Sequence, residues 1–170
     1  FIIDDGAGGT NRKTAASRIK TYIGGGVNTP LFLASMSANQ QISDQTHTKL
    51  QMAREVLDSN SKYDTSNYRF TPGETGYYTF QICVTTESGI SASVACYVYL
   101  YKNGSHTAIN PLHSDITSAS GSFNTFFMDQ ATNANDYYEA YIWQNKGSNV
   151  DLYESSSSAL TYWMGHKLIS

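Results

Sequence analysis

The chain has 170 residues and a net charge of −3 at pH 7, and only 15% of its side chains are charged. The length suits one domain with a short appendage, and the lack of a basic stripe argues against nucleic-acid binding. The longest apolar stretches, at 31–34 and 96–100, are too short to cross a bilayer, so no membrane insertion is expected. Because the chain begins at Phe1 and shows no signal peptide, we interpret it as part of a longer or processed protein.

Residues 1–26 predict a small module that differs from the rest of the chain. Residues 1–3 and 10–13 are expected to form two short strands around a glycine-rich turn. A short helix is expected over 15–23, because its apolar residues follow helical spacing, and the three glycines at 24–26 should end it and act as a hinge. Such a unit is too small to bury a core alone, so it needs neighbouring copies or an upstream stalk.

Residues 27–170 predict an all-β head. Short segments of alternating apolar and polar residues are separated by turn signals, of which Asn103-Gly104 is the strongest. This spacing is typical of a sandwich or jelly roll. The predicted strands cover residues 30–37, 49–57, 68–70, 77–85, 94–101, 123–128, 137–144, 150–153 and 160–169.

The alternation within these strands predicts which side chains face the core and which face away. The expected core set is Tyr78, Phe80, Ile82, Val84, Val94, Val98, Leu100, Tyr138, Ala140 and Ile142. The opposite set is aromatic and consists of Tyr97, Tyr99, Tyr101, Tyr137, Tyr141 and Trp143. A monomer rarely exposes so large an aromatic patch, so we expect this face to form a subunit interface. Packing against residues 1–26 and glycan binding are the alternatives.

The two cysteines are not expected to pair. In its strand Cys83 has the outward parity, whereas Cys96 has the parity of the core residues. Because the two thiols should face opposite ways, a disulfide is disfavoured.

Metal binding is not expected to be central. The histidines at 47, 106, 113 and 166 form no closely spaced pair, and a metal held by one histidine per chain on a threefold axis is only an alternative to ordinary surface histidines. The Asp4-Asp5 turn lacks the ligand spacing of a calcium loop. The segment that holds Asp129, Asn133, Asn135 and Asp136 offers a second calcium alternative. We therefore expect no cofactor, with calcium as the exception to consider.

Catalysis is not expected either. The sequence has no nucleophile elbow, phosphate loop, Cys-x-x-Cys pair or dinucleotide fingerprint. Its carboxylates are few and dispersed, so spacing does not suggest a glycosidase pair. The expectation is a binding or structural protein rather than an enzyme.

Several motifs together resemble the C1q-like family. In residues 60–80, Tyr63-Asp64 precedes Phe70-Thr71-Pro72 and then Gly76-Tyr77-Tyr78-Thr79-Phe80, which is similar to the signature of that family. Weaker similarities follow in the family's order at 100–104, 135–138 and 163–169. The resemblance covers residues 28–170, with Asn135 in place of the usual Gly and Trp163-Met164 in place of the usual Phe-Ser.

This resemblance implies a ten-stranded jelly-roll sandwich that assembles as a tight homotrimer and binds partners through loops and outer faces. It also implies that strands 94–101 and 137–144 lie in one sheet that faces the trimer axis. Residues 1–26 resemble short linker modules of tail and fibre proteins from bacterial viruses, and C1q-like heads occur on such fibres. The two domains would thus be a hairpin-and-helix linker at 1–26, which joins a fibre stalk, and a jelly-roll head at 27–170.

We therefore expect a homotrimeric head on a bacteriophage tail fibre or surface spike, which is a virion protein that acts outside the cell. Its partners would be upstream fibre or virion proteins and a host surface receptor, such as a polysaccharide. Receptor-facing loops are expected at Ser59, Lys62, His106, His113 and Ser156. The alternatives are a purely structural trimerisation cap, a secreted cellular C1q-like binding protein and an enzyme that cuts surface polysaccharide.

Overall fold

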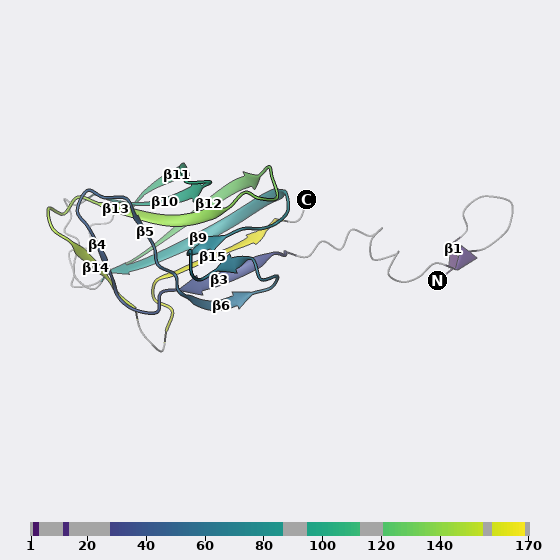
Figure 1. The fold of residues 1–170 in the computed structure, drawn as a ribbon, viewed down its shortest axis with the longest axis horizontal. Coiled ribbons are helices and arrows are strands. Elements are labelled where there is room, and N and C mark those ends of the chain that lie inside the picture. The colour runs from purple at the N-terminus through teal and green to yellow at the C-terminus, as the bar shows by residue number, and fades with distance from the viewer. Residues whose placement is uncertain are drawn as a thin grey trace.

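The computed structural model of the chain describes residues 2–3, 12–13, 28–86, 95–112, 121–154 and 158–168. Within 95–112, side chains are described only as far as residue 107. Every regular element in these residues is a β-strand (Figure 1). The predicted terminal hairpin is confirmed, because β1 (Ile2–Ile3) pairs antiparallel with β2 (Arg12–Lys13). The predicted helix at 15–23 lies outside the described residues, as do His113 and Ser156.

The first of two sheets in the head has the order β11-β10-β13-β8-β7, and β5 also pairs with β13; we call it the β10 sheet. All its pairs are antiparallel. Its strands are β5 (Thr48–Lys49), β7 (Tyr63–Asp64), β8 (Arg69–Phe70), β10 (Cys96–Lys102), β11 (Ser105–Leu112) and β13 (Tyr138–Gln144).

The second sheet has the order β4-β14-β9-β15-β3-β6, and β12 also pairs with β9; we call it the β9 sheet. In Figure 1, β9, β15, β3 and β6 lie below β10, β11 and β13. Its strands are β3 (Leu31–Ser35), β4 (Gln40–Ile42), β6 (Arg54–Asp58), β9 (Gly76–Thr86), β12 (Gly121–Ala131), β14 (Val150–Leu152) and β15 (Tyr162–Lys167).

The single strand predicted at 49–57 is wrong, because it corresponds to β5 and β6, which lie in different sheets. The sequence also missed three other elements, and the reason is local. Strands β4 and β7 have only three and two residues, too few to show an alternation. Strand β11 follows the Asn103-Gly104 turn and carries few large apolar residues, so only its pairing with β10 identifies it. The turn itself is confirmed, since Asn103 and Gly104 have φ of 53° and 80°, the left-handed values that a two-residue hairpin loop requires.

The core lies between the two sheets and follows the predicted alternation. All predicted core residues in the described part of the chain are buried; Val94 lies outside it. Aromatic rings dominate one region, where Phe32 stacks on Phe70 at 4.4 Å between centroids and meets Trp163 edge-on at 4.7 Å. Phe80 lies 4.7 Å from Tyr138, so rings from the two sheets interdigitate.

The cysteine prediction is confirmed, and the structure adds a cover over Cys83. Both thiols are free, as expected. Cys83 has the predicted outward parity, since it is not part of the core cluster that holds Ile82, Val84 and Cys96. It is nevertheless buried, because the backbone at Leu160 covers it with its carbonyl 3.5 Å from Sγ. Burial raises the pKa of both thiols, that of Cys96 to about 12, so neither is a reactive thiolate at neutral pH.

At Gly165 in β15 the core leaves no room for a side chain. A Cβ there would lie 2.5 Å from Phe80 Cδ1 and 3.0 Å from Phe32 Cε1. The two rings therefore fill the space over this strand, and glycine lets β15 pair closely with both β3 and β9.

Gly165→Ala should destabilise the head by about 1–3 kcal/mol through overpacking. Urea unfolding followed by tryptophan fluorescence measures the change. Gly147→Asn is the control, because Gly147 has open space around its Cα and asparagine tolerates a φ of 80°. Equal stability of wild type and Gly165→Ala would contradict the packing argument.

Candidate binding surfaces

The predicted aromatic face exists on the outer side of the β10 sheet. The antiparallel register sets Tyr97 opposite Trp143 and Tyr99 opposite Tyr141. Tyr97 and Trp143 lie 5.4 Å apart between ring centroids, and Tyr101 stacks on Tyr141 at 4.0 Å. The alternation thus brought these five rings together as predicted.

Two histidines join this face, and neither was predicted to do so. His47 lies 4.6 Å from the Tyr99 ring, and its Nδ1 is 3.1 Å from the Tyr101 hydroxyl. His106 lies about 6 Å from both tyrosines. It was predicted in a receptor-facing loop, but it belongs to strand β11, because the hairpin loop is only two residues long. We define the aromatic face as Tyr97, Tyr99, Tyr101, Tyr141, Trp143, His47 and His106.

The rings of the aromatic face largely cover one another. Tyr99 retains only 7% of its surface, and the other four rings from β10 and β13 are half-buried. Burial raises the pKa of Tyr99, Tyr101 and Tyr141, so these phenols stay protonated through the neutral range. The role of this face in a subunit interface stays a prediction.

Tyr137 lies at the margin of this face. It precedes β13, and the Arg69 guanidinium lies 3.7 Å from the centre of its ring. Its backbone N–H donates to the Asn103 side chain at 3.0 Å, which ties it to the hairpin tip. The structure therefore separates Tyr137 from the stacked set.

A buried carboxylate beneath this region was not foreseen. Glu139 is 2% exposed, and its Oε1 accepts hydrogen bonds from Lys49 Nζ at 2.7 Å and from Arg69 Nη2 at 2.8 Å and Nε at 3.1 Å. Lys49 belongs to β5 and Arg69 to β8, so one carboxylate holds both short strands against β13. The sequence hint was a lone acidic residue at an outward position of an otherwise aromatic strand.

Glu139→Gln should lower the free energy of unfolding by about 1–3 kcal/mol, because it removes a charged acceptor shared by two cations that are each about a third exposed. Chemical denaturation measures the loss. The matched control is Glu74→Gln, which breaks the exposed ion pair with Lys167 and should cost at most about 1 kcal/mol. Equal costs at the two sites would contradict the role given to Glu139.

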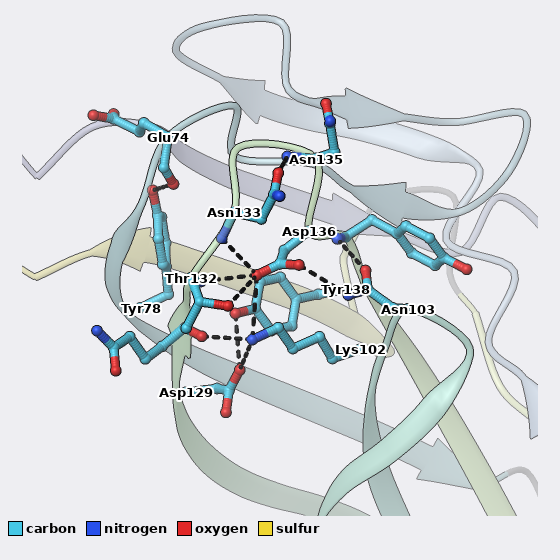
Figure 2. A network of polar contacts seen from close by, with 12 residues as sticks. Glu74, Tyr78, Lys102, Asn103, Asp129, Thr132, Asn133, Asn135, Asp136 and Tyr138 are labelled. Atoms are coloured by element: carbon cyan, nitrogen blue, oxygen red, sulfur yellow. Dashed lines mark hydrogen bonds and ion pairs between the residues drawn. The ribbon is translucent and has the colours of Figure 1, made fainter.

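The segment considered for calcium already contains a protein cation. Lys102 Nζ lies 3.3 Å from a carboxylate oxygen of Asp129 and 3.3 Å from one of Asp136 (Figure 2). Asp136 also accepts from the Asn103 side chain and from the backbone N–H of Thr132 and Asn133. A calcium ion here would have to displace the ammonium. Among the described residues, no group of three His, Cys, Asp or Glu side chains is placed to hold a metal.

This network locks the turn between β12 and β13. The hydrogen bond from Asn103, together with those from the turn backbone, holds the pKa of Asp136 well below its usual 3.8. Tyr138 donates to Asp129 at 2.9 Å from the other side (Figure 2). The ends of β10, β12 and β13 are therefore joined by charged and polar contacts.

A depressed folded-state pKa means that ionised Asp136 stabilises the fold above pH 3.8, and that this contribution is lost as the pH falls below that value. Asp136→Asn should cost about 2 kcal/mol at pH 7 and flatten the acid side of the stability curve. Urea unfolding at pH 3 to 7 measures both effects. Glu55→Gln, on an exposed strand position, is the control. A curve for Asp136→Asn parallel to that of wild type would rule out the linkage.

A second face, on the outer side of the β9 sheet, is the more exposed of the two. Phe126 and Met128 on β12 are 64% and 67% exposed, and Tyr77 on β9 is 48% exposed. Phe126 pairs across from Gln81 and Met128 from Thr79, so all three side chains share this side of the sheet. A shallow hollow of about 100 Å³ adjoins Phe126 and reaches Met164 and His166. We call Tyr77, Phe126 and Met128 the apolar face.

The apolar face was not predicted, although the alternation of β12 in the sequence could have revealed it. Phe123, Thr125 and Phe127 face the core, so Phe126 and Met128 share the outward parity of Asn124 and Gln130. Strand β6 adds two half-exposed apolar residues, Val56 and Leu57, elsewhere on the same sheet.

Of the other predicted receptor-facing residues, Ser59 and Lys62 lie in the described chain. Ser59 is exposed, but its hydroxyl accepts from Leu31 N–H at 3.0 Å, which fixes the strand end. Lys62 is half-buried, and its carbonyl accepts from Thr71 N–H at 2.9 Å. Their contacts are thus structural, and their role in receptor binding stays a prediction.

None of the described residues form a helix long and apolar enough to cross a membrane. No protein-family model matches the chain, and comparison with curated protein sequences gives no match.

Solved structures do match. Murine APRIL at pH 8.0 aligns with a TM-score of 0.55 at 17% identity, over 81% of this chain and 98% of that one. The globular domain of zebrafish complement 1qA aligns at 0.52 and 13% identity, over 82% and 96%. Eiger TNF from S. frugiperda aligns at 0.56 and 9%, over 81% and 90%. The chain has two antiparallel sheets and is similar to these solved structures. It therefore has the jelly-roll fold of the C1q and tumour necrosis factor proteins.

Proposed function

We propose that this chain is the binding head of a homotrimer, which attaches to a receptor and catalyses no reaction. The observation that carries the proposal is the apolar face, where an aromatic ring and a methionine are each about two-thirds exposed on neighbouring outward positions of β12. Exposed apolar patches of this kind mark interaction sites on soluble proteins. The occupant proposed here is a second copy of the chain.

The exposed fractions favour the apolar face over the aromatic face as the assembly surface. The hydrophobic gain on association scales with the apolar area removed from water. Tyr99 has little area left to lose, whereas Phe126 and Met128 have most of theirs. The aromatic face, with its hydroxyl and imidazole groups, then remains on the outside of the assembly, where it suits recognition of a partner.

The proposed setting is the tip of a viral tail fibre or spike, outside the cell. Two resemblances support it, that of residues 60–80 to C1q-like heads and that of residues 1–26 to fibre linker modules. Residues 1–26 would then join the head to upstream fibre or virion proteins. Three heads acting together would raise avidity for a host receptor without strong single contacts.

Sedimentation equilibrium at micromolar concentration should show a trimer of the 18.7 kDa chain. Phe126→Ser combined with Met128→Ser should dissociate it, and Tyr97→Ser combined with Trp143→Ser is the matched control on the other sheet. Dissociation by the control alone would move the interface to the aromatic face, as the sequence predicted. A monomeric wild type would overturn the trimer.

The attachment role is tested by competition, in which purified trimeric head is added before the parent virion meets its host. The head should reduce adsorption in proportion to its occupancy of the receptor. An intact trimer that leaves adsorption unchanged would favour a purely structural cap.

A further inference from the structure

We propose that a polar groove beside the aromatic face binds a short segment of a hydroxyl-rich saccharide. This inference rests on the proposed binding function and names the ligand class and the site. The groove has a volume of about 460 Å³, within the range of roughly 300–1,000 Å³ that small-molecule sites occupy. It lies between residues 46–51, which include β5, and residues 66–68, which join β7 to β8.

The chemistry of the lining points to this ligand. The described lining combines amide, hydroxyl, phenol and imidazole groups with a single ammonium; its members include His47, Thr48, Lys49, Gln51, Asn67 and Tyr68. It contains neither a carboxylate nor an aliphatic side chain. Amides and hydroxyls both donate and accept, which matches the hydroxyl groups of a sugar ring better than it matches an apolar or strongly charged ligand.

The groove also offers a flat aromatic side. His47 is exposed, lines the groove and packs against Tyr99 at 4.6 Å. Its contact with the Tyr101 hydroxyl fixes the ring where the groove meets the aromatic face. A sugar has one face of C–H groups, which can lie on such a ring while its hydroxyls reach the polar wall.

The two walls are held in place before any ligand arrives. On one wall Asp64 accepts hydrogen bonds from the N–H groups of Ser66 and Asn67 and from the Asn67 side chain, and Tyr68 adopts a left-handed φ of 52°. Just before the other wall, Gln45 has a φ of 51°, and its N–H donates to the Gln144 carbonyl. Left-handed backbone at bulky residues is costly and clusters at binding sites, where a fixed wall reduces the entropy lost on binding.

Hydrogen bonds of Lys49 join the two walls. Lys49 Nζ donates to the Asn67 carbonyl at 3.2 Å and to Glu139, so it spans the groove from β5 to the opposite loop. The Gln40 side chain bridges the backbone of Lys49 and Gln51. Lys49 shares Glu139 with Arg69, and Asp64 lies on the opposite wall. Two carboxylates thus offset two cations, so the site favours a neutral saccharide over an anionic one.

The groove stays open in the proposed assembly. Strand β5 pairs with β13 of the β10 sheet, whereas the proposed subunit contacts lie on the β9 sheet. A trimer would present three copies of the groove, so weak single affinities would combine into avidity.

The test uses the full chain on an array of defined oligosaccharides built from neutral, N-acetylated and uronic-acid sugars. We expect wild type to bind neutral or N-acetylated members, and His47→Ala combined with Gln51→Ala to bind at least tenfold more weakly. Ser66→Trp, which fills the groove from an exposed position, should also abolish binding. Asn149→Ala, an exposed amide outside the groove and outside both faces, is the matched control and should bind as wild type does. Circular dichroism and sedimentation confirm that each variant folds and assembles.

The outcomes separate the groove from the proposed function. Saccharide binding that survives both groove variants overturns the groove while leaving the binding head intact. A wild type that binds no array member yet still blocks adsorption of the virion overturns the saccharide inference alone. Preference for uronic-acid members would overturn the assignment of a neutral ligand. Failure in both the array and the adsorption assay removes the inference and the proposed function together.

Discussion

Strands β10 and β13 pair along their whole seven-residue length, and the surfaces of this protein depend on that register. Each position along the pair sends one side chain inward and the next outward. Val98 and Ile142 therefore meet in the core, while Tyr97 and Trp143 meet outside. A slip of one residue would bury the tyrosine hydroxyls and expose the aliphatic side chains, so the buried core holds the aromatic face in place.

Buried charges hold the loops around this pair. Glu139 accepts hydrogen bonds from Lys49 of β5 and Arg69 of β8, and these contacts hold both short strands against β13. Just before the start of β13, Lys102 lies between Asp129 and Asp136 and joins three strand ends (Figure 2). Because each ion is nearly surrounded by hydrogen-bond partners, these contacts fix geometry more than they add stability. The groove proposed for a saccharide depends on the contact of Glu139 with Lys49, since Lys49 lines the groove.

The two sheets thereby present different outer surfaces. The β9 sheet exposes apolar side chains, which favour contact with another copy of the chain. The β10 sheet exposes tyrosine and histidine edges beside a polar groove, which favour contact with a hydrated partner. These surfaces agree with the proposal that the β9 sheet serves assembly and the β10 sheet serves recognition of a partner.

By itself, the sequence determined the fold class, the alternation of β9, β10 and β13, the Asn103-Gly104 turn and the grouping of the outward aromatic residues. These follow from periods and turn preferences that involve residues close together in the chain. Only the tertiary structure decided that His47 meets Tyr99 and Tyr101, that Lys49 and Arg69 share Glu139, and that Leu160 covers Cys83. It also decided that Phe126 is more exposed than Tyr99. The physical reason is that alternation sets the side of a sheet on which a residue lies, whereas its exposure depends on distant segments that fold over that side.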